Sequence, residues 1–190
     1  PIHANSLASI TIELQDSIDD LSKENVDFKL VQVAKLEDGY FVLNDAFQDL
    51  DVDFNTELLA EEVEAICTKL SGYSMVGQTL VTDEEGKAVL EDVEEGLYFI
   101  DPVNINEYER MSPMLVSVPE WDGDTLNYDV LMYPKHRPFE KLIIKKIDRD
   151  SKDEILDSIE FTSFKDKDCT ESLKTFKGNG TLSILMREDA

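Results

Sequence analysis

Apolar residues recur at every second position in much of the chain, a pattern typical of strands that bury one face. Ile10, Ile12 and Leu14 alternate with Thr11 and Glu13 in the first such run. Further short apolar runs occupy residues 28–33, 40–43, 79–81, 88–90, 97–100, 114–118 and 126–133. Segments rich in Gly, Asp, Glu and Pro separate the runs, as expected for turns. This spacing predicts a mainly β chain folded as a β-sandwich.

One segment has a helical period instead. Its apolar residues are spaced four, three and four positions apart and are Leu59, Val63, Ile66 and Leu70. This spacing places them on one stripe of a helix. Asn55 has a side chain suited to the N-cap of that helix. We therefore expect a single helix, over about residues 56–71, inserted into the β-rich chain.

The charge of the chain changes near residue 140. The 190 residues have a formal net charge of −24. Residues 1–140 hold 31 acidic and 8 basic side chains, whereas residues 141–190 hold 11 and 10. Pro134 and Pro138 stand at this change, and a new apolar run begins at residue 142. These features predict a first domain at 8–138 and a second at 141–190.

The second domain is expected to be incomplete. Its strand-like runs cover residues 142–147, 159–164 and 181–186. A sandwich of this kind takes about 100 residues, and only 50 follow residue 140. We expect a partial second β-sandwich, and either the protein continues beyond Ala190 or segments of this domain are missing from the sequence.

Several classes of function are disfavoured by composition. A net charge of −24 lacks the basic surface that nucleic-acid phosphates require. No apolar run approaches the roughly 18 residues of a membrane helix, so we expect no membrane span in this chain. The start, residues 1–4, lacks the features of a secretory signal, which is therefore either absent or already removed.

Catalytic patterns are also lacking in the sequence. His3 and His136 stand in no pattern with a nucleophile, and no Gly-rich phosphate loop occurs. Cys67 and Cys169 share no metal or redox spacing. We expect neither a cofactor nor an enzymatic activity.

An acidic segment matches part of a calcium-binding loop. The matching residues are Asp51, Asp53, Asn55, Glu57 and Glu62, which stand at loop positions 1, 3, 5, 7 and 12 of an EF-hand. Thr56 occupies the sixth position, where the sharp turn requires Gly. A solvated acidic turn before the helix explains the same residues, and calcium is the weaker alternative.

Lys135 is conspicuous because lysine is scarce in the acidic part of the chain. Only six lysines occur in residues 1–140. Lys135 follows Tyr133 and Pro134 at the end of a predicted strand and at the predicted domain boundary. Proline restricts the backbone there and would help to hold the ammonium group in one direction. The alternative is an ordinary exposed lysine at a domain edge.

Several segments together resemble the N-terminal domain of Gram-positive sortase-assembled pilus subunits. They are residues 8–14, 28–34, 82–86, 96–100, 113–119 and 128–135, in this order and spacing. The family motif reads W-x-x-x-V-x-V-Y-P-K, and Val130, Tyr133, Pro134 and Lys135 match it. Leu126 stands in place of the Trp and Met132 in place of the second Val. Residues 142–190 resemble the first part of a Cna B-type domain.

The resemblance implies a fold, a location and a role. The fold would be an immunoglobulin-like or Cna B-type (prealbumin-like) β-sandwich with one inserted helix. The protein would be secreted and held at the cell wall as part of a surface pilus. Lys135 would be the acceptor that a pilus-assembling sortase joins to the C-terminal threonine of the next subunit's LPxTG-type signal. Its partners would be the sortase, other pilus subunits and a host surface ligand.

The resemblance also implies an internal Lys to Asn amide in the second domain. Lys146 is the candidate lysine, because Leu142, Ile144 and Lys146 share one face of the predicted strand. A shift of the assignment by one residue would instead leave Lys146 in solvent. In the first domain Leu14 stands at the corresponding position, which argues against the same bond there.

Three roles remain open from the sequence. The chain could be a shaft subunit, or an accessory basal subunit that receives the shaft through Lys135. A non-polymerising wall-anchored adhesin with the same fold is the alternative, and in it Lys135 would be a linker residue.

Overall fold

The computed structural model describes residues 8–73, 77–154 and 157–187, which form two compact units divided between Pro138 and Phe139. In the first unit the strands are β1 (Ala8–Glu13), β2 (Asp27–Glu37), β3 (Tyr40–Leu43), β4 (Gln78–Val81), β5 (Lys87–Val93), β6 (Gly96–Asn104), β7 (Arg110–Met111), β8 (Met114–Val118), β9 (Glu120–Asp122), β10 (Thr125–Asn127), β11 (Asp129–Met132) and β12 (His136–Arg137). Its helical segments are the 3-10 helix η1 (Asp45–Leu50) and the α-helix α1 (Ala60–Ser71).

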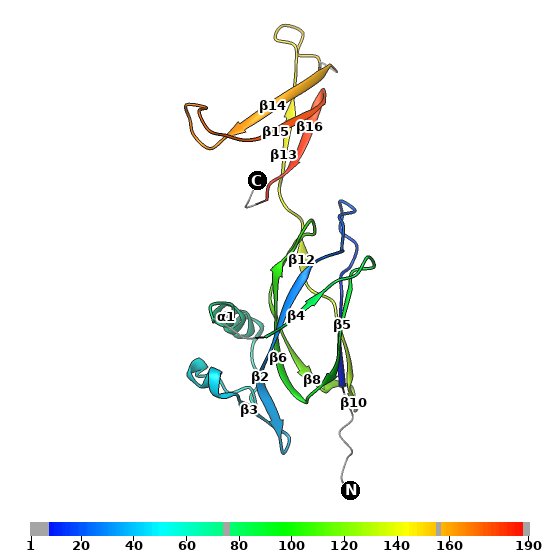
Figure 1. Ribbon diagram of the computed structural model, residues 1–190, viewed down its shortest axis with the longest axis vertical. Coiled ribbons are helices and arrows are strands. Elements are labelled where there is room, and N and C mark those ends of the chain that lie inside the picture. The colour runs from blue at the N-terminus through cyan, green and yellow to red at the C-terminus, as the bar shows by residue number, and fades with distance from the viewer. Residues whose placement is uncertain (1–7, 74–76, 155–156, 188–190) are drawn as a thin grey trace. The chain divides into compact units, whose positions relative to one another are not determined.

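Two sheets form the sandwich of the first unit. One has the strand order β11-β1-β5, and the other has the order β3-β2-β6-β8 with β4 also paired to β2. The pairing of β1 with β11 is parallel and joins Ile10 to Val130, far apart in the sequence. Figure 1 shows β5 on one side of β2 and β6, and α1 on the other. This architecture confirms the predicted mainly β sandwich with an inserted helix.

The larger core lies between the two sheets. Its sheet residues are Ala8, Ile10, Ile12, Phe28, Leu30, Ala88, Val93, Tyr98, Ile100, Val116, Val118 and Val130, and the adjoining segments add Leu14, Val26 and Tyr108. Every second residue of β1 is buried, as its alternation predicts. The first sheet is therefore held by the apolar face that the period of two provides.

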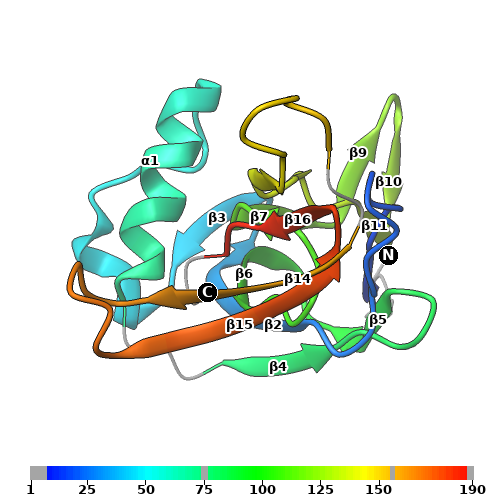
Figure 2. The ribbon, with the colours of Figure 1, turned by 90° about the horizontal axis from the view of Figure 1, so that it is seen from above.

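A second core lies on the opposite face of the five-stranded sheet. Val31, Val33 and Phe99 point away from the first core and pack against η1 and α1. The helices contribute Phe47, Leu50, Ile66, Cys67 and Leu70. Figure 2, seen from above, shows α1 and β5 on opposite sides of β2 and β6. The first unit thus has three layers, and the central sheet is covered on both faces.

The helix begins later than its sequence pattern predicts. Leu59 is the N-cap of α1, and its backbone N–H donates to the carboxylate of Glu62 at 2.7 Å. Asn55 does not cap the helix. Its side chain instead accepts the N–H of Phe41 and donates to the carbonyl of Phe41, at 2.7 and 3.0 Å. The prediction of an Asn55 cap was wrong because this amide binds the backbone of β3.

The second unit contains two antiparallel strand pairs. β13 (Lys141–Lys145) pairs with β16 (Thr181–Leu185), and β14 (Ser158–Phe164) pairs with β15 (Ser172–Asn179). Phe139, Ile159 and Leu182 are its buried hydrophobic residues within 139–154 and 157–187. Leu142 and Ile143 remain exposed. The described part of this unit therefore buries little apolar surface.

Candidate acceptor site

The Tyr133-Pro134-Lys135 segment joins β11 to β12 in the first unit. Val130, which precedes it on β11, is 1% exposed and belongs to the larger core. Pro134 is also buried, whereas Tyr133 and Lys135 are exposed. Buried residues thus hold the segment, and the lysine side chain remains in solvent.

The backbone around Lys135 is held by β7 and by Ser112, the residue after β7. The carbonyl oxygen of Lys135 accepts the N–H of Ser112 at 3.3 Å. His136 and Arg137 then pair with Met111 and Arg110 in the short β12–β7 ladder. Pro134 fixes its own φ angle and carries no N–H that needs a partner. These constraints limit the directions in which the Lys135 side chain can project.

A groove of 460 Å³ lies beside Lys135. Val63 and Cys67 of α1 line it on one side, and Met114 and Leu115 of β8 line it on another. The segment from Met132 to Lys135 contributes Met132, Tyr133 and Lys135. Glu64 and Lys135 are its charged residues, in an otherwise mainly apolar lining. An amine at the edge of an apolar groove can meet a peptide-bound acyl group there.

The groove exists because α1 covers the central sheet. Ile66 and Leu70 fix the helix through the second core, and Val63 packs against the same core. Ala60, Val63, Glu64 and Cys67 stand at positions i, i+3, i+4 and i+7 and so share the helix face that borders the groove. The sequence predicted this helix but gave no sign that it would lie beside Lys135.

Cys67 lies in the wall of the groove, and its thiol is neutral at ordinary pH. Burial, together with the nearby carboxylates of Asp101 and Glu64, raises the pKa of this thiol to about 11. Only the thiolate is an efficient nucleophile. Cys67 is therefore suited to packing rather than to chemistry, as its buried position in the second core also indicates.

This difference predicts unequal labelling of the two cysteines. At pH 8 Ellman's reagent should modify the exposed Cys169 rapidly, and Cys67 at least about 100-fold more slowly, because so little of it is thiolate. Both thiols should react at similar rates in concentrated urea. Equal rates in the folded protein would show that Cys67 is not buried as described.

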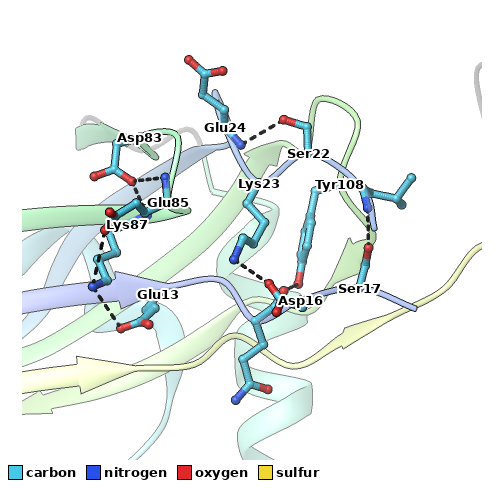
Figure 3. Close-up of polar contacts among 12 residues, drawn as sticks. Glu13, Asp16, Ser17, Ser22, Lys23, Glu24, Asp83, Glu85, Lys87 and Tyr108 are labelled. Atoms are coloured by element: carbon cyan, nitrogen blue, oxygen red, sulfur yellow. Dashed lines mark hydrogen bonds and ion pairs between the residues drawn. The ribbon is translucent and has the colours of Figure 1, made fainter. Parts of the chain in front are cut away.

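A buried carboxylate lies close to the acceptor segment. Glu109 is 1% exposed, and its Oε2 lies 2.5 Å from Nδ1 of His136. The ring of the neighbouring Tyr108 lies 5.4 Å from the His136 ring. The Tyr108 hydroxyl donates to the Gln15 carbonyl at 2.7 Å, in the segment that follows β1. Figure 3 shows the Tyr108 side chain beside the ion pair of Lys23 with Asp16.

The sequence offered no signal for Glu109. Its neighbours do not alternate as a strand with one apolar face, and Glu is rarely buried. Burial raises the pKa of Tyr108 to about 12, and the charges of Glu109 and Asp16 add to this effect. This polar cluster became apparent only from the three-dimensional contacts.

The structure does not bring the calcium candidates together as ligands. Glu62 accepts the Leu59 N–H, and Asn55 binds the backbone of Phe41. Asp53 accepts the N–H of Asn55 at 2.9 Å. Within residues 8–73, 77–154 and 157–187, no three acidic, His or Cys side chains are placed to hold a metal ion. Asp51 and Glu57 remain exposed residues of this turn.

Lys146 follows β13 in the second unit and is half-buried, whereas Lys145 is exposed. The Lys146 N–H donates to the Gly180 carbonyl at 3.0 Å. In the described part of this unit no carboxylate or amide is hydrogen-bonded to its ammonium group. The role of Lys146 therefore stays a prediction. His3, the other histidine, lies outside the described residues.

The fold resembles solved structures of pilins. The chain aligns with the major pilin SpaD of Corynebacterium diphtheriae at 20% identity and a TM-score of 0.50, over 85% of this chain and 37% of SpaD. The chain has a pilin-like fold. The T6 backbone pilin of Streptococcus pyogenes aligns at 13% identity and a TM-score of 0.49, over 84% of this chain and 37% of that one. The SpaB basal pilin of Lactobacillus rhamnosus GG aligns at 16% identity and a TM-score of 0.44, over 70% of this chain and 98% of SpaB.

The likeness to pilins is seen in the structure alone and covers only part of the length of SpaD. No protein-family profile matches the chain, and no curated protein matches it. The chain spans little more than a third of the length of SpaD. Among the described residues, no helix is both long enough and apolar enough to cross a membrane. The pilin-like fold is thus carried by structure rather than by sequence similarity.

Proposed function

We propose that this chain is part of a structural subunit of a covalently assembled cell-surface pilus, and that Lys135 is its sortase acceptor. The observation that carries the proposal is an exposed lysine on a fixed segment, at the edge of a mainly apolar groove, in a pilin-like fold. The protein would be secreted and held at the cell wall, and it would be the substrate of a sortase rather than an enzyme.

The proposed reaction is an acyl transfer to the lysine. A sortase cysteine would carry the C-terminal threonine of another subunit as a thioester. The lone pair of neutral Lys135 Nζ would attack the thioester carbonyl, an amide C–N bond would form, and the C–S bond would break. The proton lost by the amine would pass to the departing thiolate. The products are one isopeptide bond and a free cysteine thiol.

The groove supports this reaction by its position and its lining. At 460 Å³ it lies within the common range of ligand sites, about 300–1,000 Å³. Val63, Met114 and Met132 offer apolar contacts for the side chains of an extended acyl peptide. Holding the acyl group beside the amine replaces a collision in solution by reaction between neighbours. Lys135 lines the same groove, so both reactants would meet there.

The native cell wall tests the proposal. Antibodies against this chain should detect a ladder of high-mass species that resists boiling in SDS. A shaft subunit is expected in every band, and a basal subunit once per polymer, with polymers released from the wall when it is lost. Recovery of the protein as a wall-bound monomer alone would contradict the proposal and favour an adhesin.

The second unit is proposed to form an internal amide through Lys146. The half-buried position of Lys146 after β13, next to the exposed Lys145, supports this role. Formation of a Lys to Asn amide releases ammonia. The intact mass of the mature protein should therefore be lower than its sequence mass by one ammonia. An unshifted mass would rule out the bond, without bearing on Lys135.

A further inference from the structure

Glu109 is a buried carboxylate with an incomplete set of partners. Its Oε2 lies 2.5 Å from His136 Nδ1, and its Oε1 is buried without a hydrogen-bond partner within the described residues. Burial of such a group is unfavourable unless it is paired. The contact with His136 thus offsets the unfavourable burial of Glu109. Loss of either side chain would disturb the place of the other.

His136 and Lys135 are adjacent in the chain but make different contacts. His136 pairs with Met111, which packs against the larger core, so His136 faces inward with Met111. Lys135 stands just before β12, and its side chain is exposed. It lines the groove, whereas His136 contacts Glu109. His136 can therefore fix the direction in which Lys135 projects.

The β12–β7 ladder is too short to fix this direction alone. It joins only His136 and Arg137 to Met111 and Arg110. A pair of strands is marginal without further packing. The Glu109–His136 contact adds a side-chain bond beneath the ladder, and the Tyr108 ring lies beside His136. Tyr108 in turn donates to the Gln15 carbonyl, which links this end of the unit to the segment after β1.

We propose that Glu109 and His136 are positioning residues for the acceptor Lys135. They hold the inward face of β12 so that the Lys135 amine lies beside the groove. Neither residue touches the reacting atoms. This inference rests on the proposed function and adds two residues to it. A displacement of about 1 Å can slow a reaction between positioned groups by about 100-fold.

The test measures transfer to Lys135 by the pilus-assembling sortase, with a donor peptide that carries an LPxTG-type signal. His136→Ala should lower kcat for acceptor transfer by about 10- to 100-fold with little change in KM. His136→Asn should retain most of the rate, because its Nδ2 occupies the place of Nδ1. His136→Gln should resemble His136→Ala, since its amide lies one bond further out. Glu109→Ala should also lower kcat, and the exposed Glu120→Ala is the matched control.

Two further measurements separate positioning from unfolding. Acetylation of Lys135 by a small activated ester should proceed at the same rate in all these variants, because it needs exposure and not alignment. The Ser112 amide, which donates to the Lys135 carbonyl, should exchange with deuterium faster in His136→Ala. Equal kcat for His136→Asn and His136→Gln would overturn the inference, as would an unchanged kcat in His136→Ala.

The control with Lys135 keeps the inference distinct from the proposed function. If Lys135→Arg abolishes transfer and the Glu109 and His136 variants do not slow it, the acceptor is correct and the positioning role is wrong. If Lys135→Arg transfers as the wild type does, the proposed function itself fails.

Discussion

Arginine in place of Lys135 is expected to abolish covalent incorporation of this protein into polymers. Acyl transfer needs a neutral amine with a free lone pair, and the guanidinium group of arginine stays protonated at all accessible pH values. The exchange keeps the positive charge and a long side chain. Because Lys135 is exposed, the free energy of unfolding should change by less than about 0.5 kcal/mol. The variant thus loses the nucleophilic amine and keeps the fold.

The matched control is Lys35→Arg, which makes the same change at an exposed position on β2. Cells that express each variant can be compared by immunoblots of wall extracts in SDS. Ladders should persist with Lys35→Arg and disappear with Lys135→Arg for a shaft subunit. For a basal subunit, polymers should instead appear in the medium. Undiminished, wall-bound ladders in Lys135→Arg would show that another lysine is the acceptor.

Truncation of Phe99 is expected to cause a large loss of stability in the first unit. Phe99 is 0% exposed and faces the second core between the central sheet and the helices. Phe99→Ala removes a large buried side chain and leaves a cavity, at a cost of about 3–5 kcal/mol. Since α1 packs on this core and lines the groove, transfer to Lys135 should also become slower at temperatures where the protein remains folded.

Urea denaturation followed by circular dichroism measures this effect. Tyr40→Ala is the control, because Tyr40 is an exposed aromatic residue on β3, and it should cost less than about 0.5 kcal/mol. A similar loss in both variants would contradict the assignment of Phe99 to a packed core. Phe28→Ala should cost as much as Phe99→Ala, because Phe28 is equally buried in the larger core.

The sandwich could be predicted because its pattern is local. Alternation identifies the buried face of β1 without any long-range information. The central strand β6 is different, since residues 97–100 form a continuous apolar run that does not show a single buried face. The structure explains this run, because Tyr98 and Ile100 face the larger core and Phe99 the second. That second core depends on where the helix packs, which no local pattern specifies.

The candidate site was predictable only in part. The position of Lys135 after Tyr133 and Pro134 was visible in the sequence, since these residues are consecutive. The groove was not, because Glu64 and Cys67 approach it from a helix about 70 residues earlier. Glu109 was missed for a similar reason. Its contact with His136 joins residues 27 positions apart, and isolated acidic residues usually lie in solvent.

The calcium alternative rests on a sequence pattern whose residues do not form a ligand cluster among the described residues. Spacing alone aligned the acidic residues with loop positions. The side chains of Asn55 and Glu62 are instead engaged with backbone N–H groups. A metal loop needs its oxygens to converge on one point, and the turn from residue 51 to 57 lacks the glycine that permits this.

Tandem mass spectrometry of polymers extracted from the cell wall tests the central claim most directly. After proteolysis, we expect a branched peptide in which the Lys135 side chain forms an amide with the C-terminal threonine of a cleaved sorting signal. The fragment ions locate the branch to a single residue. Recovery of Lys135 only in unbranched peptides from these polymers, with the branch at another lysine, would contradict the assignment of Lys135 as the acceptor.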